Sequence, residues 1–336
     1  MFDKIEASRL KELHIKYDEE SQLHAIVAIH NTRLGPSLGG CRMIEYDNDE
    51  LAIQDAINLS QSMSYKAALA GLELGGGKSV ILKPKGAFDR KLLLTRFAEF
   101  INDLSGRYIT AIDCGTSIED MDIIHNQTPY VRGTSFEGDP SFNTAVGVFL
   151  GIKSCVQHKF KTHSLKGIRV AIQGLGKVGY TLALLLHEQG AKLTVCDLNP
   201  ALTEKAHDKL KAEVVGVDQI YDVSSDVFAP CGLGGVINDK TISQLNCDII
   251  AGSANNQLAT PELGLELYNK EILYAPDYVI NSGGLIFAAL RNQHSVIEHK
   301  TENIPKVLHR IFDQSDTLDK EPSEIARQIA EKILYH

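Results

Sequence analysis

The amino-acid sequence predicts a two-domain α/β protein, a mixed α/β domain followed by a doubly wound parallel-sheet domain. The chain has 336 residues, enough for two cores of ordinary size. Its composition, 43% hydrophobic and 23% charged, is typical of globular proteins. The hydrophobic pattern also changes along the chain, from alternating apolar stretches to continuous apolar runs that are separated by helices.

The first block, from about residue 10 to 130, predicts strands that are interrupted by helices. Asp49 begins the first helical pattern, in which Leu51, Ile53 and Ala56 form part of an apolar stripe. The predicted helices span about 49–65, 89–104 and 117–126. The predicted strands are 13–17, 24–29, 40–46, 79–83 and 107–112.

The second block follows turn-forming residues at 133–143 and a helix expected from Thr144 to about 158. Its predicted strands are 168–173, 192–197, 213–217, 226–229, 248–251 and 272–274. We expect the last thirty residues, about 305–336, to fold back onto the first domain. The expected domains are therefore 1–135 plus 305–336, and 136–304.

Composition excludes several classes of protein and site. The net charge is -9, and no Lys/Arg block marks a nucleic-acid surface. No apolar run reaches the roughly 18 residues that a membrane span needs, and the first residues lack a signal core. The six cysteines lack metal-ligand spacing, so we expect reduced thiols, no metal and a cytoplasmic protein.

A glycine motif between a predicted strand and a predicted helix indicates a dinucleotide site. Gly174 permits a sharp turn, Gly176 lets the backbone approach a pyrophosphate, and Gly179 allows the helix to pack on the strand. Asp197 ends the next strand, where a carboxylate binds ribose hydroxyls and favours NAD over NADP. The alternative is a glycine-rich turn that binds nothing. The motif runs Gly174-Leu175-Gly176-Lys177-Val178-Gly179.

Three glycines at 75–77 precede Lys78 and suggest a second site. We expect them to form a tight turn whose backbone a substrate can approach closely. A partly desolvated amine near a second cation loses proton affinity and can act as a base near neutral pH. A nucleotide-hydrolase phosphate loop is a weak alternative, because Leu72 occupies the position where that motif needs glycine.

Taken together, the motifs resemble those of the leucine, valine and phenylalanine dehydrogenases, in the same order across nearly the whole chain. The resemblance implies an N-terminal substrate domain, a Rossmann domain that binds NAD, and a cleft between them. It also implies reversible oxidative deamination of an L-amino acid to a 2-oxo acid and ammonia by a homo-oligomer. The matching strings are LGPSLGG at 34–40, SYKAA at 64–68, GLELGGGK at 71–78, DCGT at 113–116, TAVG at 144–147, GLGKVG at 174–179, APCGLGG at 229–235, IAGSANNQ at 250–257 and YAPDYVINSGG at 274–284.

The resemblance assigns roles to three charged residues. Lys66 would bind the substrate carboxylate, Lys78 would activate the water that attacks the imino intermediate, and Asp113 would exchange protons with the substrate amine. These roles agree with the chemistry, because hydride loss requires a neutral amine and hydrolysis requires a base. A solvated surface lysine and a turn-capping aspartate are the alternative interpretations.

The resemblance also implies smaller contributions to both sites. Thr144, Asn255 and Asn281 would lie near the nicotinamide, and Asn256 near the substrate amine, with the choice between the two adjacent asparagines left open. Each could instead be a loop amide that bonds its own backbone. The other residues implied in the sites are Gly39 and Gly40 beside the substrate, Cys231 beside the cofactor, and Leu38, Ala111, Leu285 and Ala288 around an apolar side-chain pocket.

Departures from the family pattern affect the expected substrate. Ile112 stands where relatives often have an acid, and Phe287 stands where leucine enzymes usually have asparagine. The pocket has no charged anchor, which argues against glutamate. We therefore expect a branched-chain substrate, with an aromatic amino acid or a catalytically silent NAD-binding protein as alternatives. One methylene changes discrimination by roughly 1–3 kcal/mol, enough to shift the preference among leucine, valine and isoleucine.

Overall fold

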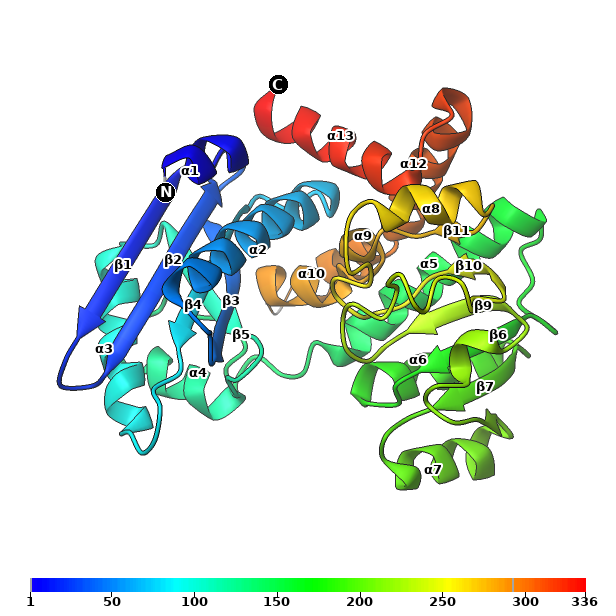
Figure 1. Cartoon of the computed structure of the whole chain (residues 1–336), viewed down its shortest axis with the longest axis horizontal. Coiled ribbons are helices and arrows are strands. Elements are labelled where there is room, and N and C mark those ends of the chain that lie inside the picture. The colour runs from blue at the N-terminus through cyan, green and yellow to red at the C-terminus, as the bar shows by residue number, and fades with distance from the viewer. Residues whose placement is uncertain (1, 292) are drawn as a thin grey trace. The chain divides into compact units, whose positions relative to one another are not determined.

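A computed structural model describes residues 2–291 and 293–336 and divides the chain into two compact units (Figure 1). Unit 1 contains residues 2–139, 288–291 and 330–336. Unit 2 contains residues 140–287 and 293–329. Within the described residues, no helix combines the length and the apolar character that a membrane crossing requires.

Unit 1 is built on a mixed five-stranded sheet with the order β1-β2-β4-β3-β5. Strands β1, β2 and β4 pair antiparallel, whereas β4, β3 and β5 pair parallel. This confirms the mixed α/β prediction. The elements are α1 (Phe2–Ser8), β1 (Glu12–Asp18), β2 (Leu23–Asn31), β3 (Ser37–Ile44), α2 (Asp49–Leu69), β4 (Gly75–Leu82), α3 (Arg90–Asp103), β5 (Tyr108–Ile112) and α4 (Ile118–His125).

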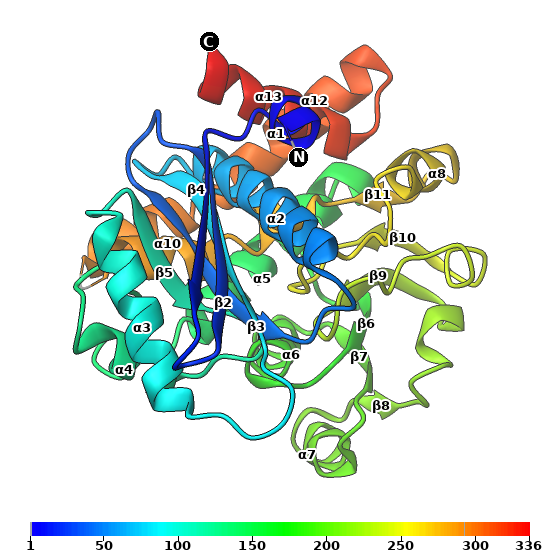
Figure 2. The same ribbon diagram turned by 60° about the vertical axis from the view of Figure 1, so that its left-hand side comes forward.

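Helices cover both faces of this sheet, with α2 on one side and α3 on the other (Figure 2). Ile26, Ala28 and Val80 pack against α2, while Val27 and Ile81 belong to the core on the α3 side. Strand residues alternate between the faces. Lys78, which lies two residues before Val80 and opposite Ala28, therefore faces the α2 side.

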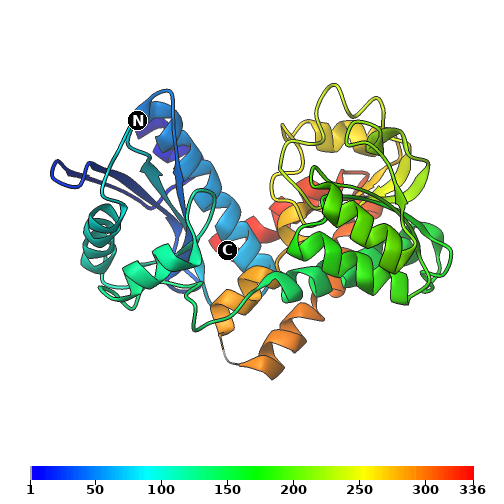
Figure 3. The same cartoon turned by 90° about the horizontal axis from the view of Figure 1, so that it is seen from below.

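Unit 2 is built on a six-stranded parallel sheet with the order β11-β10-β9-β6-β7-β8. The order reverses between β6 and β9, which is the doubly wound topology that the βαβ pattern predicted. Helices α5 and α6 lie side by side in this unit (Figure 3). Its first elements are α5 (Ser141–Phe160), β6 (Arg169–Gln173), α6 (Lys177–Glu188), β7 (Lys192–Cys196), α7 (Pro200–Leu210), β8 (Glu213–Val214) and a 3-10 turn (Ile220–Asp222). The elements that follow are β9 (Ser225–Pro230), β10 (Cys247–Ile250), α8 (Leu263–Asn269), β11 (Leu273–Tyr274), α9 (Asp277–Ile280), α10 (Gly283–Leu290), α11 (His294–Thr301), α12 (Ile304–Leu318) and α13 (Pro322–Tyr335).

The C-terminal segment differs from the expected domain boundary. Residues 305–329 cluster with unit 2, and only 330–336 cluster with unit 1. Helix α12 packs on α5, where the side chain of Ile304 fills the space above Gly147 and Ser154 bonds the carbonyl of Pro305. The sequence alone could not identify the surface on which this segment packs. The substrate and dinucleotide roles of the two domains remain predictions.

Candidate functional site

Lys78 lies on β4 in the interior of unit 1, with only 5% of its surface exposed. Its ammonium contacts Oδ2 of Asp113, the residue that follows β5. The Asp113 backbone N–H donates to Oγ1 of Thr116 at 3.0 Å, and that hydroxyl donates to the carbonyl of Cys41. The turn that carries Asp113 is therefore anchored to β3. The structure brings together the two residues that the sequence predicted as the proton-transfer pair.

Burial lowers the pKa of Lys78 from its ordinary value to about 7, and the positive charge of Arg42 acts in the same direction. The charge of Lys66 adds a smaller effect of the same sign. Contact with the Asp113 carboxylate opposes these effects, because a negative neighbour favours the charged amine. Lys78 is therefore an amine that can exchange a proton near neutral pH, and it lies in direct contact with the Asp113 carboxylate.

Lys66 lies in the last turn of α2, the helix that covers the Lys78 face of the sheet. The helix is fixed two residues earlier, where Oγ of Ser64 bonds Nδ1 of the buried His30 at 2.8 Å. Because the charge of Lys66 affects the pKa of Lys78, the structure brings both predicted lysines into one electrostatic environment.

The three glycines before Lys78 do not form the expected turn. They begin β4, and parts of the protein occupy the space where their side chains would be. A Cβ at Gly76 would lie 2.0 Å from the backbone nitrogen of Ser64, and one at Gly77 would lie 2.7 Å from the ring of Tyr108. These glycines allow close packing of helix and strands. The prediction that they leave the backbone open to a substrate was wrong.

Gly40 lies directly against the Lys78–Asp113 pair. A Cβ there would be 2.7 Å from Cβ of Asp113 and 3.3 Å from Nζ of Lys78. Gly40 pairs in register with Ala111, so that the strand surface beside the pair carries very little side-chain volume. At position 39, by contrast, only glycine fits, because a Cβ at Gly39 would lie 1.7 Å from the carbonyl oxygen of Gly77.

The residues predicted for an apolar pocket come from three elements. Leu38 lies on β3 two residues before Gly40, on the same face of the sheet, and is 2% exposed. Ala111 lies on β5 and is half-buried. Leu285 and Ala288 are half-buried and three residues apart on α10, so they share one side of that helix.

In unit 2, the predicted dinucleotide loop connects β6 to α6 at the point where the strand order reverses. Gly174 has a φ of +95°, a conformation that favours glycine. A Cβ at Gly179 would lie 2.0 Å from the carbonyl oxygen of Gly174. Among the described residues, nothing lies within 4 Å of a Cβ at Gly176. Gly176 is the N-cap of α6 and makes no side-chain capping bond, and a helix N-terminus favours phosphates. The loop therefore fits a pyrophosphate.

The other residues of the glycine motif lie in the loop and at the start of α6. Leu175 is buried and offers only its backbone, Lys177 is exposed at the start of α6, and Val178 is half-buried on the same helix. Asp197, just after β7, accepts the Leu175 N–H at 2.6 Å and the Asn199 N–H at 2.8 Å. Its carboxylate is thereby held beside the glycine loop, as the dinucleotide pattern requires.

The remaining predicted residues lie in unit 2, partly in contact with one another. The amide of Asn281, which is 5% exposed, donates to Oδ1 of Asn255 at 2.8 Å. Asn256 adopts a φ of 50° in the loop after β10. Thr144 lies on α5, where its hydroxyl faces Gly284. Cys231 packs beside Gly179, and burial raises the pKa of its thiol.

Sequence reasoning missed Arg42. It lies on the same strand face as Gly40, with Nε 3.5 Å from Oδ2 of Asp113 and Nη1 2.9 Å from Oδ2 of Asp55. The period-2 spacing from Gly40 could have indicated it. No sequence signal pointed to its partner Asp55 on α2.

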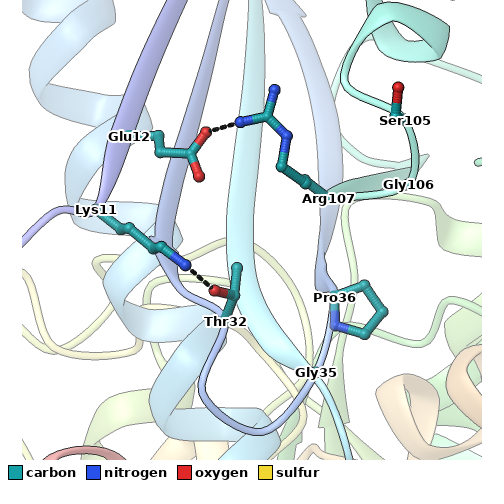
Figure 4. Close-up of a pocket in the computed structure, with 8 residues that line it drawn as sticks. All are labelled: Lys11, Glu12, Thr32, Gly35, Pro36, Ser105, Gly106 and Arg107. Atoms are coloured by element: carbon teal, nitrogen blue, oxygen red, sulfur yellow. Dashed lines mark hydrogen bonds and ion pairs between the residues drawn. The ribbon is translucent and has the colours of Figure 1, made fainter.

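A separate open pocket of about 290 Å³ lies at the opposite ends of β3 and β5 from Asp113 (Figure 4). Its cations already have partners, since Lys11 contacts Thr32 and Arg107 contacts Glu12. Within the described part of the chain, no group of three His, Cys, Asp or Glu side chains is placed to hold a metal.

Two family models match the chain. The Glu/Leu/Phe/Val dehydrogenase dimerisation domain matches residues 8–130, and the Glutamate/Leucine/Phenylalanine/Valine dehydrogenase model matches residues 139–206 and 199–318.

Individual proteins are similar over nearly the whole chain. Leucine dehydrogenase from Thermoactinomyces intermedius is 46% identical over 94% of this chain and 86% of its own length. L-tryptophan dehydrogenase from Nostoc punctiforme is 43% identical over 88% of this chain and 83% of its own length. A crystal structure of L-tryptophan dehydrogenase from Nostoc punctiforme has a TM-score of 0.89, with 37% identity over 99% of this chain and 98% of that chain.

Proposed function

Because the chain belongs to the Glu/Leu/Phe/Val dehydrogenase family, we propose that it catalyses NAD-dependent oxidative deamination of a branched-chain L-amino acid. The products would be the 2-oxo acid and ammonia, and the reaction would be reversible. The observation that carries the proposal is the buried contact between the Lys78 amine and the Asp113 carboxylate.

The three charged residues of unit 1 would divide the chemistry. Lys66, in its charged form, would bind the substrate carboxylate. Asp113 would remove a proton from the substrate ammonium, because only a neutral amine can support hydride loss from the α-carbon. Neutral Lys78 would then take a proton from the water that attacks the iminium carbon. A pKa near 7 suits this base, since a sizeable fraction is neutral at physiological pH.

The residues of the glycine loop would hold the cofactor. Gly176 and the α6 N-terminus would receive the pyrophosphate, and Asp197 would bind the ribose hydroxyls and repel a 2′-phosphate. When bound, the nicotinamide would supply the hydride acceptor. Thr144, Asn255 and Asn281 would contribute polar contacts to it.

The amino-acid side chain would contact Leu38, Ala111, Leu285 and Ala288. These residues supply apolar surface without a charge, which supports leucine, valine or isoleucine. An aromatic amino acid is the second candidate, and the likeness to the tryptophan enzyme is the observation that favours it. We also propose a homo-oligomer assembled through unit 1, which matches the dimerisation-domain model.

A substrate panel tests the proposed function. Leucine, valine, isoleucine, phenylalanine and tryptophan are each supplied with NAD or NADP, and cofactor reduction is followed at 340 nm. We expect the highest kcat/KM with a branched-chain substrate and NAD. A higher kcat/KM with phenylalanine or tryptophan would select the aromatic alternative. NADH binding without turnover of any amino acid would indicate a silent dinucleotide-binding protein.

Lys78→Ala tests the assigned base. Turnover should fall by at least about a thousandfold, because the variant lacks the group that activates water. NADH binding, measured by fluorescence, should remain. Lys85→Ala, which removes an exposed lysine from the turn after β4, is the matched control and should retain full activity. Undiminished turnover in Lys78→Ala would refute the role.

A further inference from the structure

Arg42 connects the Lys78–Asp113 pair to α2, the helix that carries Lys66. Its side chain is 20% exposed and lies between two carboxylates, Asp113 at the end of β5 and Asp55 on α2. Oδ2 of Asp55 also accepts a hydrogen bond from Tyr46 at 2.6 Å. The guanidinium is therefore held from the helix side while it approaches Asp113.

Lys78 and Arg42 approach the same oxygen of Asp113. The Lys78 ammonium contacts Oδ2, and Nε of Arg42 lies 3.5 Å from it. Among the described residues, the other oxygen of that carboxylate has no donor. Two cations that share one oxygen each receive less stabilisation from it than one cation would. Arg42 therefore weakens the attraction of Asp113 for the proton on Lys78 and leaves the second oxygen for a substrate amine.

We propose that Arg42 is a positioning residue whose charge beside Asp113 keeps Lys78 neutral, with Asp55 setting how strongly it does so. This inference rests on the proposed function for its catalytic meaning. Its electrostatic part predicts how Lys78 titrates, and this titration can be measured without a substrate.

The charged and titratable groups that lie near Lys78 come from three elements. Strand β3 contributes Arg42 and the Cys41 thiol, and helix α2 contributes Asp55 and Lys66. Asp113 follows β5. Burial raises the pKa of Cys41 to about 12, so the thiol carries no charge in the working pH range. Arg42 affects the pKa of Lys78 more than Asp55 or Lys66 does.

Two substitutions should shift the titration of Lys78 in opposite directions. Arg42→Gln removes the competing cation, so the midpoint should rise by about one pH unit. Asp55→Asn removes a negative neighbour and frees Arg42 to act on Asp113, so the midpoint should fall by about half a unit. The midpoint is read from the 13Cε resonance of Lys78 in [13Cε]-lysine-labelled protein, assigned by comparison with Lys78→Arg.

The acid limb of kcat/KM should follow the same two shifts. Arg96→Gln is the matched control, because Arg96 forms ion pairs with Glu20 and Glu99 in unit 1 and is not among the charges named as acting on Lys78. It should lower the melting temperature and leave the midpoint unchanged. If Arg42→Gln fails to fold, the test rests on two other variants. Arg42→Lys keeps the charge and should keep the midpoint, whereas Asp55→Asn should still lower it.

Shifts of the same sign in Arg42→Gln and Asp55→Asn, or no shift in either, would overturn the role of Arg42. If the wild-type protein deaminates no amino acid, the proposed function fails. The resonance of Lys78 still tests the electrostatic arrangement in that case.

Discussion

The two glycine motifs of this chain have similar sequences but different surroundings. In unit 1, the backbone of Ser64 lies 2.0 Å from a would-be Cβ at Gly76. In unit 2, nothing among the described residues lies within 4 Å of a would-be Cβ at Gly176. The first motif is filled by the protein itself, whereas the second leaves space at a helix N-terminus. A glycine run therefore indicates close approach, and only its surroundings tell whether a ligand or another part of the chain approaches.

The largest effect expected from this comparison is the loss of folded unit 1 in Gly76→Ala. The new methyl group would overlap the backbone of α2, which cannot move without breaking the Ser64–His30 hydrogen bond. Overpacking against backbone should cost more than about 3 kcal/mol of unfolding free energy. Urea unfolding followed by circular dichroism measures it. Wild-type stability in this variant would show that α2 is free to shift.

Gly40→Ala should reduce turnover by about a hundredfold, because its methyl group would push Asp113 away from Lys78. Binding of NADH should be unchanged, since the glycine loop belongs to unit 2. Steady-state kinetics and NADH fluorescence titration measure the two quantities. Equal losses of turnover and cofactor affinity would mean that the substitution disturbs more than the contact between Lys78 and Asp113.

Acid should also affect the two regions differently. The pKa of Lys78 is lowered to about 7, so its neutral form is the main form above that pH. Below it, kcat/KM for the amino acid should fall about tenfold per pH unit, because the base becomes protonated. The affinity for NADH should stay constant from pH 6 to 8. A rate that is flat through this range would exclude Lys78 as the base.

Sequence patterns predicted the fold more completely than the site. Apolar patterns predicted a strand at each of the eleven places where the described residues form one, and the spacing from Gly179 predicted that Asp197 lies beside the loop. Both are local features, since each depends on one strand, turn and helix. The spacing from Gly40 could have placed Arg42 on the same strand face, but its contacts with Asp55 and Asp113 could not be predicted, because a charge network across elements leaves no periodic signal. The prediction of the domain on which α12 packs was wrong for the same reason.

Gly176→Ala should have the smallest effect on folding of the three glycine substitutions. Gly176 is the N-cap of α6 with a φ of -60°, which alanine adopts readily. Alanine is a poorer N-cap than glycine by roughly 0.5–1 kcal/mol, but it also reduces the entropy of the unfolded chain by a similar amount. The unfolding free energy should therefore change by less than about 0.5 kcal/mol. Because the methyl group would occupy the space above the helix N-terminus, the Kd for NADH should rise about tenfold. Calorimetric unfolding and fluorescence titration of the same sample separate the two effects, and an unchanged Kd would mean that the open space at Gly176 is not where the pyrophosphate binds.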